Sequence, residues 1–149
     1  MDVELSRRTQ RLLYQAEQLL VLASEQKGSL QLACEVGALA LIEHGLAALV
    51  AELAAPQPVG RGDWQQLLTA LPDTLQERRL LERALLAVDG ELHDLYCRLE
   101  QQHAEHRSPT PTALIVTTAS PDERVAQLRS QLLALRRMID ALREYSRFC

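Results

Sequence analysis

The sequence predicts an all-α protein, a four-helix antiparallel bundle with a short extra helix at about 64–71 and an extended linker at about 107–119. Apolar residues recur at alternating steps of three and four along four long segments, which is the pattern of helices packed in a bundle. The 149 residues include only one Trp, three Tyr and one Phe, so Leu, Ala and Val must form the core. Such a core suits packed helices better than a sheet. The length favours one domain, residues 1–149, with no need for disulfide or metal cross-links.

The first predicted helix runs from about Asp2 to Gln26 and leads directly into the second. In Lys27-Gly28-Ser29, the glycine is expected to be a left-handed C-cap and the serine the N-cap of the next helix. So short a connection makes the two helices an antiparallel hairpin. The positions of the first helix expected to face the bundle are Leu5, Thr9, Leu12, Ala16, Leu19 and Ala23, widened by Leu13 and Leu20.

The second predicted helix, from Ser29 to Ala54, carries apolar or small residues almost all round, so it is expected to be buried almost all round. A line of large residues and a line of small residues beside it are expected to face the bundle, the small ones allowing a neighbouring helix to come close. These two lines are Val36, Leu39, Leu46, Val50 and Leu53, and Ala33, Gly37, Ala40, Ala47 and Ala51.

A further apolar arc of the same helix lies where solvent is expected. Leaving large apolar side chains of this arc in water would forfeit roughly 1.5–3 kcal/mol each. We therefore predict a homodimer, or an obligate complex with another protein, that covers this arc. The alternative is a cover from within the chain, by the short helix beginning at Trp64 or by the run Leu114-Ile115-Val116. Glu35 and Glu52 would form the polar rim of the interface. The candidate interface residues are Ala38, Ile42, Gly45 and Leu49.

A short helix and a long one are predicted next. Asp63, with Gln66 three residues later, is typical of a capping box, and Pro72 ends the short helix. The same spacing at Asp73 and Gln76 predicts the start of the next helix.

The long helix is predicted to run without a break from Thr74 to about Glu105. The motif Asp89-Gly90 is typical of a turn, but the apolar steps of three and four continue across it. We therefore expect Gly90 in the helix interior, at a cost of roughly 1 kcal/mol relative to alanine. The residues that keep the pattern are Leu81, Leu85, Val88, Leu92, Leu95 and Leu99.

The prolines at 109 and 111 and the β-branched residues that follow predict the extended linker, with Leu114, Ile115 and Val116 lying along a helix groove or pairing with another chain. Ser120-Pro121-Asp122-Glu123 then combines a serine N-cap, a proline at the first helical position and a glutamate that closes a capping box. The last helix is predicted to reach about Arg147. Its core positions are Val125, Leu128, Leu132, Leu135, Ile139 and Leu142.

Charge and cysteine content favour a cytoplasmic protein. The formal charge of −4 gives no general attraction for nucleic acid. Three cysteines without metal-type spacing, and the lack of a basic and apolar leader, indicate a reducing compartment. Glutamates interrupt the apolar stretch 29–54, and each central one would cost roughly 2.5–3.5 kcal/mol in a bilayer, so we expect no membrane span.

Two residues that interrupt the most apolar stretch, Glu43 and His44, are candidates for buried polar side chains. They would serve as a general acid or base or a ligand, or as a structural pair with an arginine that fixes helix register. A Glu-x-x-His element at Glu100 and His103 matches half of a di-iron site, but the sequence supplies no second copy.

His93 and Cys97, one turn apart, could supply two zinc ligands but lack a second pair. No nucleophile with its base and no cofactor fingerprint is present. We therefore expect no metal, no cofactor and no enzymatic activity.

Two arginine patterns leave a role with nucleic acid as the alternative function. Arg98 and His103 resemble the Arg-x4–6-His element of HEPN-type helical ribonucleases, although a polar residue usually follows that arginine and here it is Leu99. Arg129, Arg136 and Arg143, spaced by seven, could bind phosphates or form a solvated face. Acids interleave with them and no aromatic surface accompanies them, which favours the solvated face. Arg7, Arg8 and Arg11 suggest an acidic contact within the chain or on a partner.

Several residues of the first helix resemble a small gammaproteobacterial family known only as a domain of unknown function. They are Glu4-Leu5, Arg8-Thr9, Tyr14 and Ala16, together with the short C-terminal tail that ends at Cys149. The resemblance implies a bacterial cytoplasmic protein and assigns no site residues. The favoured function is that of a non-enzymatic helical interaction, adaptor or regulatory protein that self-associates or docks a partner.

Overall fold

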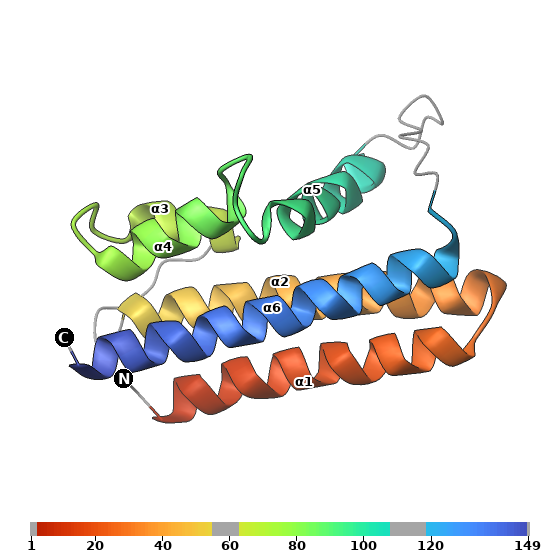
Figure 1. The fold of residues 1–149 in the computed structure, drawn as a ribbon, viewed down its shortest axis with the longest axis horizontal. Coiled ribbons are helices and arrows are strands. Elements are labelled where there is room, and N and C mark those ends of the chain that lie inside the picture. The colour runs from red at the N-terminus through yellow and green to blue at the C-terminus, as the bar shows by residue number, and fades with distance from the viewer. Residues whose placement is uncertain (1–2, 55–62, 108–118, 149) are drawn as a thin grey trace.

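The structure is a computed structural model that describes residues 3–54, 63–107 and 119–148. These residues form helices and short connections without strands, so the predicted all-α class is confirmed. The long helices α1, α2 and α6 lie side by side, and the shorter helices α3, α4 and α5 form a layer over α2 and α6 (Figure 1). The helices are α1 (Val3–Glu25), α2 (Gly28–Ala54), α3 (Trp64–Ala70), α4 (Gln76–Leu85), α5 (His93–Arg107) and α6 (Pro121–Phe148).

The first two helices form the predicted antiparallel hairpin, and glycines allow both its turn and its close packing. Gly28 has φ of +63°, a left-handed conformation that glycine adopts without strain, so its predicted role is confirmed. Farther along α2, a Cβ at Gly45 would lie 2.6 Å from a methyl carbon of Leu13. Glycine therefore lets α1 and α2 approach closely at this level.

The orientation of α2 differs from the prediction, because α1, α3, α5 and α6 all contact this helix. The arc predicted to face outward is instead its most deeply buried arc, so the proposed location of the interface is wrong. These residues are covered by the protein's own helices and need no second chain to leave water. They are Ala38, Ile42 and Leu49, all fully buried, and Gly45, buried against Leu13.

The surface of α2 that remains most exposed is made largely of the small residues predicted to face the bundle. We call it the outer stripe of α2. It begins at Leu30, whose exposed fraction is 55%. It continues at steps of three and four without an Asp, Glu, Lys or Arg side chain, and it includes one histidine. Its residues are Leu30, Ala33, Gly37, Ala40, His44, Ala47 and Ala51, each exposed or partly buried.

The prediction of one continuous helix across Gly90 is wrong. Helix α4 ends at Leu85 and α5 begins at His93. In between, the chain forms a compact loop, which is closed by a 2.9 Å hydrogen bond from the Leu92 amide to the carbonyl of Ala84. A Cβ at Gly90 would lie only 2.4 Å from the same carbonyl oxygen, so the turn requires glycine.

The apolar periodicity survives this break because Leu85 and Leu92 reach the core from either side of the turn. They are seven positions apart in the sequence, which is about two helical turns, so the sequence pattern is the same for a helix and for this loop. Val88, which a continuous helix would bury, is 87% exposed. Its exposure is the consequence of the turn.

Two of the four predicted N-caps are confirmed. Ser29 lies inside α2, which begins at Gly28, so its predicted role as the N-cap is wrong. At α3, the Asp63 side chain accepts a hydrogen bond from the Gln66 amide, and the reciprocal bond is present. At α6, the Glu123 amide donates to Ser120 Oγ over 3.2 Å, and the glutamate side chain accepts from the Ser120 amide.

The predicted cap at Asp73 is wrong. The residue that precedes α4 is Leu75, which makes no side-chain cap hydrogen bond. The Asp73 carboxylate instead lies 2.6 Å from a guanidinium nitrogen of Arg78.

The last helix follows the sequence pattern closely. All six predicted core positions of α6, from Val125 to Leu142, are buried. Of the predicted linker, Arg107 belongs to α5, whereas the run Leu114 to Val116 lies outside the described residues.

Within the described residues, α2 is the one helix whose length and mean hydropathy of 1.7 would allow it to cross a membrane. Half of that apolar stretch is buried inside the protein. A core helix of a bundle has the same properties, so the absence of a membrane span stays a prediction.

Candidate functional site

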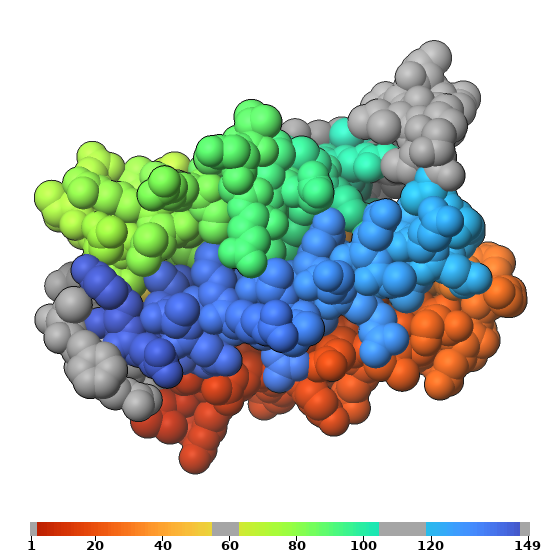
Figure 2. All heavy atoms as spheres, in the orientation of Figure 1, coloured from red at the N-terminus to blue at the C-terminus, as the bar shows by residue number. Residues whose placement is uncertain are grey.

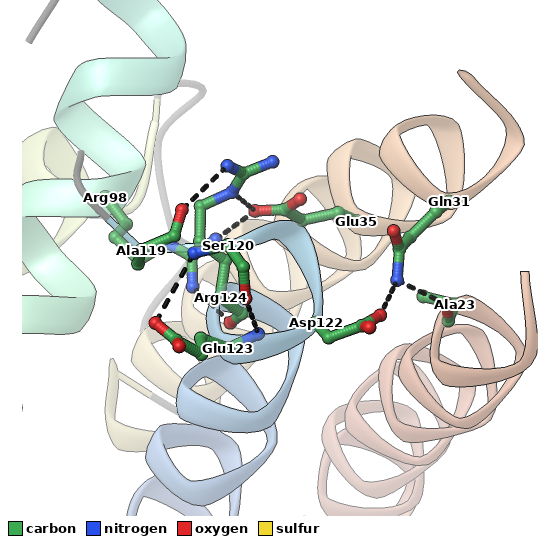
Figure 3. A network of polar contacts seen from close by, with 9 residues as sticks. All are labelled: Ala23, Gln31, Glu35, Arg98, Ala119, Ser120, Asp122, Glu123 and Arg124. Carbon is green, nitrogen blue, oxygen red and sulfur yellow. Dashed lines mark hydrogen bonds and ion pairs between the residues drawn. The ribbon is translucent and has the colours of Figure 1, made fainter. Parts of the chain in front are cut away.

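A buried ion cluster joins α2, α5 and α6 around Glu35 (Figure 3). The Glu35 side chain is only 6% exposed, and one of its oxygens pairs with both Arg98 and Arg124. Arg98 also donates to the backbone carbonyl of Arg124 over 2.9 Å. Burial lowers the pKa of Arg98, and the charge of Glu35 opposes that shift. Two cations on one carboxylate therefore hold three helices at this level.

A groove of about 790 Å³ runs beside this cluster and is lined mainly by polar side chains. The second oxygen of Glu35 and the amide oxygen of Gln131 are buried there, and neither has a hydrogen-bond partner among the described protein atoms. Both atoms are acceptors, so the groove could receive hydrogen-bond donors such as water. The other polar residues that line it are Asp94, Arg98, Gln101, Gln102, Arg124, Gln127 and Ser130.

A second buried ion pair joins α2 and α6 at the other end of α2. The Glu52 side chain is fully buried, and both its oxygens lie 3.3 Å from the same nitrogen of Arg143. The Thr9 hydroxyl of α1 donates to Glu52 over 3.0 Å. Glu52 therefore links three long helices, and Arg143 adds a 3.4 Å bond to the carbonyl of Ser6.

A third polar contact connects α2 with the start of α6. The Gln31 amide donates to Asp122 over 2.7 Å and to the backbone carbonyl of Ala23 over 3.1 Å (Figure 3). Lys27 lies 3.2 Å from the same carboxylate. The hydrogen bond from Gln31 and then the hydrogen bond and charge of Lys27 lower the pKa of Asp122.

The predicted buried polar pair is divided between two environments. Glu43 is partly buried and lies 2.7 Å from His103 of α5, so it has a histidine partner rather than the predicted arginine. Burial raises the pKa of Glu43, and His103 opposes that shift. His44 is exposed, so its predicted burial is wrong.

The alternative nuclease pair, Arg98 and His103, is engaged by two different glutamates of α2. Arg98 pairs with Glu35, and His103 pairs with Glu43. A phosphate would have to displace both acids to reach them. Glu100, the glutamate of the Glu-x-x-His element, accepts a 3.0 Å hydrogen bond from Gln65 of α3.

The predicted zinc-type pair lies in contact, with His93 Nε2 3.4 Å from the sulfur of Cys97. In the part of the chain that the structure describes, no group of three or more His, Cys, Asp or Glu residues could hold a metal ion. The other ring nitrogen of His93 lies 3.0 Å from the carbonyl of Leu85, at the turn between α4 and α5.

The arginines of α6 do not form one uniform stripe. Arg143 is bound by Glu52, Arg136 pairs with Glu17 of α1, and Arg129 is exposed. The structure therefore assigns two of the three arginines to intramolecular ion pairs.

Glu35 and Glu52 were predicted to lie at the polar rim of an interface, and their role as buried ion-pair residues was not predicted. Both continue the arc of Ala38 and Leu49 at the same steps of three and four, and Gln31 extends it by another turn. This continuity was a usable signal, since polar residues at the ends of a buried arc require partners. Arg98 of α5 and Arg124 and Arg143 of α6 are the partners of the two glutamates.

The fold and these contacts define a class of protein: an all-helical protein whose buried charges are paired within the chain. Its ion pairs connect distant segments and suit a role in fixing helix register. The chain belongs to the Family of unknown function (DUF6586), whose model matches residues 1–149. This match confirms the resemblance to a domain of unknown function. No curated protein and no solved structure matches the chain.

Proposed function

We propose that the protein is a non-enzymatic helical interaction protein, of adaptor or regulatory type, that self-associates through the outer stripe of α2. The observation that carries this proposal is the absence of Asp, Glu, Lys and Arg along the stripe from Leu30 to Ala51. A surface helix normally presents charged and polar residues to solvent. A long apolar surface without them is typical of an interaction site.

The charged side chains of α2 form ion pairs elsewhere and do not belong to this surface. Its three charged residues, Glu35, Glu43 and Glu52, all have partners on α5 or α6. The outer stripe is therefore apolar except at His44.

A second copy of the chain suits this surface. Two identical stripes bring no fixed like charges together, and the exposed alanines at 33 and 40 allow two helix backbones to approach closely. Leu30 at one end adds a large exposed apolar side chain to the contact.

We also propose that α4 and α5 together take the place of the fourth helix in a four-helix bundle with α1, α2 and α6. We further propose that the protein is cytoplasmic.

Sedimentation velocity of the purified protein tests the proposal. We expect the wild type to be a dimer at micromolar concentration and Ala40→Glu to be a monomer, because the substitution places two carboxylates in the contact. Ala126→Glu is the matched control, since Ala126 is an exposed alanine on α6. It should remain a dimer, and circular dichroism should show all three proteins folded.

Two results would overturn self-association through this stripe. One is a wild-type protein that stays monomeric at tens of micromolar. The other is an Ala40→Glu variant that dimerises as tightly as the control.

A further inference from the structure

A second groove lies between α1 and α6, on a different surface from the outer stripe of α2. It measures about 570 Å³, and arginines from both helices line it. Figure 2 shows this face of the molecule, with α6 in blue beside α1 in red. The four arginines that line the groove are Arg7, Arg11, Arg136 and Arg143.

The arginines contributed by α1 have little compensation from the rest of the chain. Within the described residues, Arg7 has one ion pair, 4.0 Å long, with Glu4, and both side chains are exposed. Arg11 is exposed and makes no ion pair or hydrogen bond within the described residues. By contrast, Arg136 and Arg143 already pair with glutamates. The open positive charge of the groove therefore lies on the α1 wall.

The distribution of charge over the molecule strengthens this asymmetry. Helices α1 and α6 together carry nine arginines against seven acidic residues, in a chain whose formal charge is −4. The remaining segments therefore carry a net charge of −6. An acidic ligand would be attracted to the α1–α6 face and repelled by the rest of the surface.

We propose that this groove docks an acidic, amphipathic segment of a partner protein. Leu13 and Ile139 give the groove an apolar floor, and exposed Tyr14 stands on its α1 wall. Such a floor accommodates apolar side chains, while Arg7 and Arg11 pair with carboxylates.

A peptide suits the groove better than a nucleic acid strand. Exposed Asp140 stands on the α6 wall and would repel a continuous phosphate backbone. A peptide can place a basic or neutral residue opposite Asp140. Among the described residues that line the groove, Tyr14 is also the single aromatic side chain, whereas strand binding commonly uses several stacking surfaces.

Fluorescence anisotropy with three labelled probes tests this inference. The first probe is a synthetic helical peptide with leucines on one face and glutamates on the other. The second replaces every glutamate by lysine, and the third is a single-stranded oligonucleotide of similar length. We expect the glutamate peptide to bind best, with an affinity that falls as salt concentration rises.

Variants connect the binding to the groove. The double variant Arg7→Glu, Arg11→Glu should weaken binding of the glutamate peptide about tenfold or more, since it reverses both open charges. Tyr14→Ser should weaken the salt-resistant part of the binding. Arg83→Glu is the matched control, since Arg83 is an exposed arginine of α4, and its affinity should stay near that of the wild type.

Three results would overturn the inference. They are equal or tighter binding of the lysine peptide, tighter binding of the oligonucleotide, and an unchanged affinity in the double variant. The outcome is independent of the proposed self-association, because Ala40→Glu leaves this groove intact and should bind the glutamate peptide like the wild type.

Discussion

Glu52→Gln is expected to destabilise the protein strongly, although it changes one oxygen for one nitrogen. The side chain of Glu52 is fully buried and that of Arg143 is 14% exposed. The substitution removes the buried counter-charge of the guanidinium and leaves only the exposed carboxylate of Asp140, 3.9 Å away. Arg143 cannot recover a full aqueous environment, and its Nε is already buried without a hydrogen-bond partner among the described residues.

The expected loss follows from the burial of this pair. Removing one partner of a buried ion pair costs about 3–5 kcal/mol, because the remaining charge is uncompensated. A chain of about 150 residues loses roughly 2–4 °C in melting temperature per kcal/mol. The variant should therefore melt on the order of 10 °C below the wild type.

Urea denaturation measures the loss of unfolding free energy and thermal unfolding measures the fall in melting temperature, both followed by circular dichroism, and a second variant isolates the cause. The double variant Glu52→Leu, Arg143→Met removes both charges and should recover most of the stability, since an apolar pair of similar volume is often neutral or better. Thr9 keeps a hydrogen-bond acceptor in both variants, because its single hydroxyl hydrogen can turn to the carbonyl of Leu5, 3.2 Å away.

The matched control is Glu17→Gln at the pair with Arg136, whose side chains are 43% and 41% exposed. An exposed pair of this kind contributes about 0–1 kcal/mol. The reasoning would be refuted if Glu52→Gln cost no more than this control. It would also be refuted if the double variant were as unstable as the single one, because the loss would then come from packing rather than from an unpaired charge.

Three further predictions concern two turns and one partly buried carboxylate. Gly90→Ala should cost about 1–3 kcal/mol in urea denaturation, because its Cβ would collide with the carbonyl of Ala84, and a smaller cost would contradict the tight turn. Gly28→Ala should cost about 1 kcal/mol by the same assay, because φ is +63°, whereas an unchanged midpoint would argue against a left-handed residue. Glu43→Gln should change the pH dependence of stability: burial raises the pKa of Glu43 in the folded state, so the wild type loses stability as the pH rises through that raised pKa. The glutamine variant does not titrate, so its stability relative to the wild type should improve from about pH 4 to neutral pH; a constant difference across that range would exclude the effect.

The apolar periodicity predicted a helix correctly where only a helix fits the observed spacing. The pattern from Val125 to Leu142 continues for several turns between a strong N-cap and the end of the helix, and all its core positions are buried. At Gly90 the same kind of pattern misled, since a seven-residue spacing fits both two helical turns and a compact loop. The close approach of Gly90 to the carbonyl of Ala84 depends on tertiary structure and leaves no trace in the periodicity.

The orientation of α2 was harder to predict, because a helix that is apolar on every side has no single face that identifies the core. The buried arc is marked instead by its polar ends. Glu35 finds its arginines 63 and 89 residues away, and Glu52 finds its arginine 91 residues away. Such pairings cannot be read from local spacing, whereas the short-range capping boxes at α3 and α6 could.

These long-range pairs have a consequence for the order of folding during synthesis. The hairpin of α1 and α2 uses local contacts and can form while the later segments are still being made. Its Glu52, however, faces the position of α6, and the compensating cation arrives only with Arg143. Until then the carboxylate is stable only in contact with water, which keeps the hairpin hydrated along that side. We expect docking of α6 to replace this water with the guanidinium of Arg143, so that the described fold becomes stable only after α6 has been synthesised.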